Sequence, residues 1–512
     1  LNLWFKYTIK MSFSFLNTVM SWFLKKRIHE IELFKKYPIE VQNETLSNLL
    51  KSAQKTEFGN KYDFKSINNS KSFISRVPIS NYESFYPFIE RSIKGEQNIF
   101  WSEPIKWFAQ SSGTTNSISK YIPVSNDTLE KCHFQAGKDA LCLYINNNEN
   151  SNLFSGKSLR LGGSKKLYEN NNHFFGDLSA ILIDNLPIWA EMMSTPNNKI
   201  SLMNKWDEKI EAIIKNTINE NVTSLAGVPS WMLTLLNNVL IHTKKTNISE
   251  IWSNLEVYFH GGVNFSPYKQ EFKKILPSNI HFYETYNASE GFFALQDQNN
   301  SEELLLMLDY GIYYEFLEMN NSEIISDIPI NLSDVKKGVN YAIIISTNSG
   351  LWRYKIGDTI KFTSLNPFRI RITGRIKSFI NAFGEELIIE NAEKALEQTL
   401  LSHKINIVEY TVAPFFMNNK KSGFHQWLIE FKNPPNDLMK FKKELDINLQ
   451  NLNTDYKSKR FKNITMSEIE IVTARENQFY DWLKAKKKLG GQNKVPRLCN
   501  DRKLMDELLK LN

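Results

Sequence analysis

The chain has 512 residues, longer than one ordinary domain, which predicts roughly two to four domains. Hydrophobic residues make up 42% and charged residues 23%, proportions of a soluble globular protein that exclude disorder, collagen and coiled coil for the whole chain. The net charge of +8 is small for this length and its basic residues are dispersed, which argues against nucleic-acid binding and fits an anionic substrate.

The cysteine content and the N-terminus indicate a reducing, cytoplasmic location. Three cysteines are present, none in a C-x-x-C pair, and three cannot build a disulfide framework. The most apolar N-terminal run, residues 11–24, is interrupted by polar residues and is shorter than the ~20 residues that span a bilayer. Lys25–Arg27 follows it, where a signal peptide would carry small residues. We expect a buried or amphipathic helix, with a membrane-surface helix as the alternative, and Met11 as a candidate start of the native chain.

The N-terminal part predicts helices followed by a pair of strands. Residues 25–58 place apolar side chains at helical spacing, and Pro38 divides them into two helices. A strand at 105–109 and a second at 120–124 flank a loop rich in Ser and Thr. Residues 126–143 predict another helix, capped by its first residue, an asparagine, or by the serine before it.

Strands and helices alternate in the middle of the chain. A strand ending near Gly227 precedes a helix that runs to about His242, and strands at 255–260 and 281–286 follow. This alternation predicts a largely parallel sheet. Ligands bind beyond the carboxyl ends of strands in such sheets, and two polar, glycine-containing loops occupy that position here.

Closely spaced strands between 304 and 372, one of them at 350–354, predict an antiparallel or barrel-like part. The remaining predicted elements alternate between helix and strand: 390–401, 408–413, 425–431 and 436–450. We therefore expect an α/β protein with a large N-terminal domain over 1–376, containing mixed or parallel sheets and the barrel-like part. A small C-terminal α/β domain would cover 377–512.

The first candidate site is a hydroxyl-rich loop, composed of Ser111, Ser112, Gly113, Thr114 and Thr115. Hydroxyls and backbone N–H groups around a glycine form an anion cradle, and Lys120 on the next segment could add a positive charge. The loop lacks the Gly-Lys-Ser/Thr ending of a Walker A motif. An ordinary Ser/Thr-rich turn is the alternative.

The second candidate site follows the strand at 281–286. Glu290, beside the hydroxyl of Ser289, suits a hard cation such as Mg²⁺, and the ring of Tyr286 could stack on a base. The alternative is a helix N-cap, with Ser289 as the cap and Glu290 in the first turn.

Three further residues suit nucleotide binding. Asp358, after Gly357, offers two acceptor oxygens to vicinal ribose hydroxyls, with a plain hairpin turn as the alternative. The forked cation of Arg375 suits phosphate or ribose, unless it forms a surface salt bridge. Lys494 follows a Gly-Gly pair on a loop that could deliver it to a reacting phosphate, and a flexible basic tail is the alternative.

The order of these motifs resembles the acyl-adenylate-forming superfamily, and within it the auxin-responsive (Gretchen Hagen) family of acyl acid amido synthetases and its bacterial members. The likeness extends over about residues 20–505 and rests on the hydroxyl-rich loop, Tyr286–Glu290, Tyr354–Asp358, Gly374-Arg375 and Lys494–Arg497. Two segments depart from the superfamily pattern. Residues 116–120 lack the second Gly and the Pro-Lys of the phosphate loop, and Ile376-Lys377 replaces the Asp after the hinge Arg. Both fit the amido synthetases better than the acyl-CoA ligases.

The resemblance implies a two-step reaction that uses ATP and Mg²⁺. A carboxylate attacks the α-phosphate of ATP to give acyl-AMP and pyrophosphate, and the mobile small domain then rotates. An amine, expected to be an amino acid, attacks the acyl carbon to form an amide and release AMP. The chemistry needs alignment and charge neutralisation more than acid–base groups.

The resemblance also implies a role for each candidate residue. The residues from Ser111 to Thr115 would hold phosphates; Gly261, Gly262 and Val263 would contact adenine or the acyl chain; Tyr286 would stack on adenine; Ser289 would contact the α-phosphate; Glu290 would ligate Mg²⁺; Asp358 would bind ribose; Arg375 would bind ribose or phosphate; and Lys494 would stabilise the adenylation transition state. The acyl pocket would use the helix at 126–143, including Phe134, and residues near Trp231, for both of which core packing is the alternative.

The sequence therefore predicts an ATP-dependent, AMP-forming acyl acid amido synthetase. We expect a cytoplasmic monomer that acts on a small carboxylic acid and an amino acid or other amine, with no nucleic-acid partner and no membrane span. Two other functions stay open: an acyl-CoA or carrier-protein ligase with a thiol acceptor, and a non-catalytic acyl or nucleotide binder.

Overall fold

The computed structural model describes most of the chain. The described residues are 26–111, 120–162, 167–170, 172–203, 205–262, 265–320, 323–376, 379–380, 382, 385, 387–415, 423–453, 456–457, 460, 466–487, 494–499 and 501–511. The apolar run at 11–24 and most of the hydroxyl-rich loop lie outside them. No helix in these ranges combines the length and the apolar character that a membrane crossing requires.

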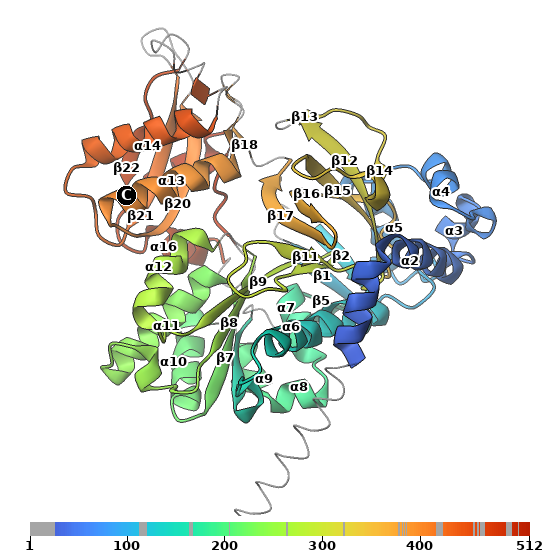
Figure 1. Ribbon diagram of the computed structural model, residues 1–512, viewed down its shortest axis with the longest axis horizontal. Coiled ribbons are helices and arrows are strands. Elements are labelled where there is room, and N and C mark those ends of the chain that lie inside the picture. The colour runs from blue at the N-terminus through green and yellow to red at the C-terminus, as the bar shows by residue number, and fades with distance from the viewer. Residues whose placement is uncertain are drawn as a thin grey trace, which may run out of the picture.

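The N-terminal helices form as the spacing predicts. One helix ends at Lys36, and α2 (Pro38–Ala53) begins directly with the proline, which needs no N–H partner in a first turn. The side-chain amide of Gln42, on α2, donates to the carbonyl oxygens of Leu308 and Ile312, both at 2.9 Å. These bonds attach the helix to the antiparallel strands beneath it (Figure 1).

One large mixed sheet runs through the N-terminal part (Figure 1). Its parallel half comprises β6 (Ser194–Thr195), β3 (Lys157–Leu161), β7 (Val222–Gly227), β8 (Val257–Gly261) and β9 (His281–Ala288), in that spatial order. The predicted strands and the predicted parallel pairing are confirmed. The helix α11 (Pro229–Thr243) follows β7, also as predicted.

Helices cover both faces of the parallel half because its strands alternate between two apolar faces. Leu225 and Tyr258 belong to a buried cluster under α10 (Trp206–Thr217), α11 and α12 (Ser266–Ile275). Phe259 and Tyr283 point to the other face and make edge contacts with Tyr144 of α6 (Gln135–Asn147). The result is the three-layer arrangement of an α/β protein.

The helix before α6 starts as predicted. Helical residues begin at Asn126, and the hydroxyl of Ser125 accepts the backbone N–H of Thr128 at 3.0 Å, so the serine is the cap. Residues Thr128–Phe134 form a π-helical stretch that continues into α6. A second sheet lies beside this helix, with β1 (Trp107–Ser111) between β2 (Lys120–Val124) and β5 (His173–Gly176).

The strands after β9 correct the prediction of a barrel-like part. A tight hairpin leads from β9 into antiparallel β10 (Gly291–Leu295), and the sheet then continues outward instead of closing on itself. Its further strands, in spatial order, are β11 (Leu304–Leu306), β17 (Phe368–Arg375), β16 (Tyr354–Leu365), β15 (Asn340–Thr347), β12 (Ile312–Asn320) and β13 (Glu323–Ile324). Among the described strands, β13 and β6 are the two open ends.

The strand predicted at 350–354 is wrong. Thr347 to Gly350 form a turn, in which Gly350 has a φ of +80° and lies too close to Phe100 for a larger residue. Trp352 is fully buried and stacks against Phe58, with the two ring centroids 6.2 Å apart. Its apolar character therefore reflects core packing and not strand alternation. The strand β16 begins only at Tyr354.

The C-terminal part has a sheet of its own. This sheet comprises β20 (Ile407–Phe415), β21 (Phe424–Phe431) and β22 (Glu470–Thr473). The helices α13 (Ile389–His403) and α14 (Leu438–Leu452) pack on it around a buried cluster that includes Leu396, Trp427 and Phe441. These four elements, α13, β20, β21 and α14, lie within a few residues of their predicted ranges.

The C-terminal part contacts the large sheet through α12. Arg497 donates to the hydroxyl of Tyr268 at 2.8 Å, and Lys432 forms an ion pair with Glu271. A mixed apolar cluster joins Leu428 and Val495 to residues of α11 and α12. The C-terminal part therefore lies at the carboxyl ends of the parallel strands (Figure 1).

Candidate active site

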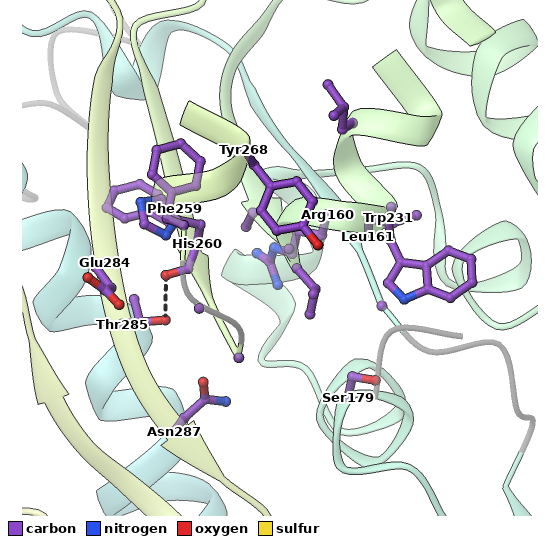
Figure 2. A pocket seen from close by; sticks show the side chains of 18 of the residues that line it. Arg160, Leu161, Ser179, Trp231, Phe259, His260, Tyr268, Glu284, Thr285 and Asn287 are labelled. Carbon is purple, nitrogen blue, oxygen red and sulfur yellow. Dashed lines mark hydrogen bonds between the residues drawn. The ribbon is translucent and has the colours of Figure 1, made fainter. Parts of the chain in front are cut away.

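A cavity of about 2040 Å³ opens at the carboxyl ends of β7, β8 and β9. Its walls come from these strands, from helices on both faces of the sheet and from the segment at 494–497. Figure 2 shows part of the lining, including Arg160, Trp231 and Glu284. The described residues that we predicted for the site and that line the cavity are Gly261, Gly262, Tyr286, Ser289, Glu290, Asp358 and Lys494. Residues far apart in sequence thus meet where an open α/β sheet binds its ligand.

Tyr286 and Asp358 lie in direct contact. The phenol of Tyr286 donates a hydrogen bond of 2.8 Å to Oδ2 of Asp358, and both side chains are buried. The Tyr286 ring also packs on the ring of Phe293, with the two centroids 4.9 Å apart. The bond orients the carboxylate, which is what recognition of a ribose diol requires.

Asp358 does not occupy a hairpin turn. It lies within β16, immediately after Gly357, whose φ of +90° accompanies a register shift against β15. The extra residues of this bulge re-aim the side chain that follows, a common use of bulges next to sites. On the other side, Asp358 pairs with Arg375 of β17, which brings the backbone of Arg375 beside it; the Arg375 side chain is outside the described part.

Ser289 and Glu290 form the tight turn between β9 and β10, where Ala288 pairs with Gly291. This excludes the helix-cap alternative, because no helix begins there. Both side chains are buried although they lie in a turn, and both line the cavity. Glu290 thus holds a carboxylate at the carboxyl end of a strand, as the sequence predicts.

Two glycines, Gly261 at the end of β8 and Gly262 directly after it, lie where a side chain would meet close neighbours. A Cβ on Gly261 would lie 2.4 Å from the carbonyl oxygen of Thr285, and that residue's hydroxyl donates to the carbonyl of His260 at 3.1 Å (Figure 2). Gly262 has a φ of +84°, and a Cβ there would lie 3.4 Å from Nζ of Lys494. The Lys494 ammonium therefore lies against this glycine.

Lys494 belongs to a segment that is held in place. The hydroxyl of Thr411 donates to the carbonyl of Pro496 at 2.6 Å, and the N–H of Val412 donates to the carbonyl of Arg497 at 2.8 Å. The guanidinium of Arg497 lies over the ring of Tyr410 and also pairs with a carboxylate of β20. For residues 494–499 these bonds exclude the alternative of a flexible basic tail.

Other predicted residues are only partly described. The backbone of Ser111 ends β1, whereas Ser112, Gly113, Thr114, Thr115 and Val263 lie outside the described residues. Lys120 starts β2 with its ammonium 5.2 Å from the centre of the Tyr82 ring. Phe134 and Trp231 are buried and also line the cavity, so each residue both packs in the core and contributes to the pocket wall.

Three lining residues were missed by sequence reasoning. Burial lowers the pKa of His133 to about 4, so this imidazole is neutral, and neither of its nitrogens has a hydrogen-bond partner within the described residues. Burial, helped by Glu302 and Glu393, raises the pKa of Glu284 to about 7. Burial lowers the pKa of Arg160 to about 10. A charged residue within a strand of a parallel sheet that helices cover on both faces is the sequence signal that could have marked Glu284 and Arg160.

The described residues hold no cluster of three or more His, Cys, Asp or Glu side chains with metal-binding geometry. Mg²⁺ does not require one, since it is commonly bound through one or two carboxylates together with substrate phosphates and waters. The buried carboxylate of Glu290, turned into the cavity, fits that pattern.

Comparison with protein families matches the chain in three consecutive pieces. The GH3 family N-terminal domain matches residues 27–280, the central domain 305–375 and the C-terminal domain 390–503. The chain belongs to the GH3 family. This confirms the predicted family, and with it the predicted enzyme class, an acyl acid amido synthetase.

Relatives of this GH3 chain are distant but cover it well. An indole-3-acetic acid-amido synthetase of Arabidopsis thaliana is 22% identical, over 92% of this chain and 91% of the relative. A jasmonoyl-L-amino acid synthetase of Nicotiana attenuata is also 22% identical, over 75% of this chain and 78% of its own.

Solved structures confirm the predicted adenylate-forming fold. The GH3.15 acyl acid amido synthetase superposes with a TM-score of 0.79 at 17% identity, covering 95% of each chain. A 2-hydroxyisobutyryl-CoA ligase in complex with an acyl-AMP superposes with a TM-score of 0.59 at 13% identity, covering 92% of this chain and 90% of the ligase.

Proposed function

We propose that this GH3 protein activates a carboxylic acid with Mg-ATP as acyl-AMP and then transfers the acyl group to an amino acid. The observation that carries the proposal is the approach of the Lys494 ammonium to Gly262, in the cavity that also contains the Tyr286–Asp358 pair. A cation and a ribose-type acceptor pair that line one cavity match the charge distribution of a nucleotide. The names of the curated relatives, which conjugate acids to amino acids, support the acceptor.

In the first half-reaction an oxygen of the substrate carboxylate forms a bond to the α-phosphorus, and the bond from that phosphorus to the bridging oxygen of pyrophosphate breaks. Asp358 would hold the ribose, and Ser289 would contact the α-phosphate. Lys494 would stabilise the negative charge of the transition state. Mg²⁺, held by Glu290 and phosphate oxygens, would neutralise the departing pyrophosphate.

In the second half-reaction the amine attacks the acyl carbon and AMP departs with the electron pair of the acyl–oxygen bond. We propose that residues 377–512 form a domain that rotates between the two steps. Its separate apolar cluster and its polar contacts with α12, such as Arg497 to Tyr268, support this division. Movement of that domain would withdraw Lys494 and admit the amine.

The test is a pair of assays on the purified protein. Acid-dependent release of pyrophosphate from ATP, screened over carboxylic acids, reports the first step. Mass spectrometry of products formed with an amino acid mixture or with coenzyme A reports the second. Amides are expected and thioesters are not. Thioester formation alone would assign the protein to the ligases, and absence of pyrophosphate release with every acid would contradict an adenylating enzyme.

A further inference from the structure

One wall of the cavity is mostly apolar and contains a guanidinium. The helices α6, α7 (Leu178–Asp184) and α8 (Ile188–Met192) cover the face of the parallel sheet that carries Phe259. Most lining side chains from this layer are small or apolar, among them Ala136, Ala140, Leu178, Leu182 and Ile183, while Ser179 adds a hydroxyl and Trp189 an aromatic ring. Arg160 of β3 lines the same wall (Figure 2).

Arg160 has fewer partners than its five N–H donors demand. Its Nη2 donates to the carbonyl of Ala190 at 2.9 Å, and no ion pair of Arg160 occurs among the described residues. Burial lowers its pKa to about 10, and no carboxylate offsets that shift. The side chain therefore stays charged at neutral pH without a counter-ion, an arrangement that costs free energy unless a ligand supplies the missing anion.

The carboxylate of Asp139, on α6, already has partners. Arg27 bonds Asp139 of α6 at 2.6 Å, and Tyr310 donates to the same carboxylate at 2.8 Å. On the next strand, the register partner of Arg160 is Ala226, which has no polar side chain. Neither residue gives Arg160 a counter-ion, and no carboxylate contributes to its pKa shift.

The position of Arg160 sets where such a ligand would lie. Arg160 pairs with Ala226, and Ala226 pairs with Phe259, so Arg160 is two strands from Phe259 in the same row. Gly262 follows three residues after Phe259. With strands ~4.8 Å apart and a rise of ~3.3 Å per residue, the Cα atoms of Arg160 and Gly262 are roughly 14 Å apart.

We propose that Arg160 forms an anion subsite at the far end of the acyl pocket, and that the preferred acyl acid carries a second carboxylate on an apolar spacer. One carboxylate would lie near Gly262 and Lys494 and be activated, while the distal one would form a paired, charge-assisted contact with Arg160. The inference rests on the proposed function, because it assumes that the cavity holds the acyl substrate.

The test compares matched acids that differ only at the distal end. Suberate is compared with octanoate, and terephthalate with 4-methylbenzoate, in both pyrophosphate release and direct calorimetric binding without ATP. The wild-type protein is expected to show at least a tenfold higher kcat/KM for each diacid, mainly through KM. Succinate, too short to reach Arg160, should be a poor substrate.

Two variants separate recognition from structure. Arg160→Met keeps the volume and removes the charge; it should lose the diacid preference at least tenfold while keeping or improving activity with octanoate. Ala226→Asp supplies an internal carboxylate beside Arg160 and should have the same effect with the arginine intact. Arg160→Lys keeps the charge but lacks the forked guanidinium, so its diacid preference should lie between those of the wild-type protein and Arg160→Met. Melting temperatures monitor folding.

The outcomes of this test distinguish a failure of the anion subsite from a failure of the proposed function. Equal loss with diacids and monoacids in both variants, or a wild-type protein with no preference between matched acids, would overturn the subsite. Diacid-selective binding that disappears in Arg160→Met, without pyrophosphate release from any acid, would support the subsite and contradict adenylation. Pyrophosphate release that favours monoacids would support adenylation and contradict the subsite.

Discussion

The hydroxyl of Tyr286 donates a 2.8 Å hydrogen bond to the carboxylate of Asp358, from β9 to a residue 72 positions later in β16. The strands are not neighbours, since β10, β11 and β17 separate them in the sheet. The curvature of the sheet and the bulge at Gly357 are what bring the two side chains together. The pair links the parallel half of the sheet to the antiparallel half.

Replacing Asp358 with Ala should raise the KM for ATP at least tenfold. A hydrogen bond to a charged group is worth roughly 1.5–3 kcal/mol, and the ribose would lose this one. Tyr286→Phe removes only the orienting hydroxyl and should raise the same KM by a smaller factor. Steady-state kinetics at saturating acid measure both, and an unchanged KM in the Asp358 variant would leave that residue a purely structural role.

Glu290→Gln should abolish pyrophosphate exchange while the protein stays folded, because the neutral amide is a weak Mg²⁺ ligand. Raised Mg²⁺ concentration should restore part of the activity. The matched control is Glu169→Gln, an exposed carboxylate on β4 (Tyr168–Asn170). Normal exchange by the Glu290 variant at ordinary Mg²⁺ concentration would contradict its assignment as a ligand.

Lys494→Ala should lower the adenylation rate by about 10²–10³-fold, the usual effect of removing one electrostatic stabiliser. The variant should still convert presynthesised acyl-AMP and amine to amide at a near-normal rate. Lys503→Ala, whose side chain is 89% exposed, is the matched control. Equal losses in the two half-reactions would show that Lys494 is structural or that the C-terminal part does not move.

Arg353→Met should destabilise the protein by about 3–5 kcal/mol, because it leaves the carboxylate of Glu315 buried without its counter-ion. The two side chains are 3% and 1% exposed and lie 2.9 Å apart. The double variant Arg353→Met/Glu315→Met should recover much of this loss. Urea unfolding followed by fluorescence measures both, and a double variant less stable than the single one would contradict the explanation.

Glu284 should make stability depend on pH. Burial raises its pKa from 4.5 to about 7, so between these values the folded protein keeps a proton that the unfolded chain releases. The contribution of protonated Glu284 to the free energy of unfolding is therefore fully present below about pH 4.5. It is lost as pH rises through about 7, which lowers that free energy by up to about 3 kcal/mol. Glu284→Gln should raise the melting temperature at about pH 8 and leave it unchanged near pH 4. An equal shift at both pH values would exclude titration as the cause.

Local periodicity in the sequence was sufficient for most elements. The helix from Pro229 and the elements from α13 to α14 lie within a few residues of their predicted ranges, because helical and strand spacing is encoded in short windows. Predictions failed where local pattern and packing disagree. Trp352 gives 350–354 the composition of a strand, although its side chain fills the core beside a turn.

The order of motifs along the chain determined the family and the adenylate-forming fold, and it supplied the residues of the candidate site. Only the tertiary structure decided how those residues meet: Glu290 in a hairpin turn instead of a helix cap, Asp358 after a bulge instead of in a turn, and Lys494 against Gly262. It also showed that Arg160 lines the cavity without a counter-ion among the described residues. The physical reason is that sheet register and the docking of the C-terminal part depend on contacts between distant segments, which no local spacing encodes.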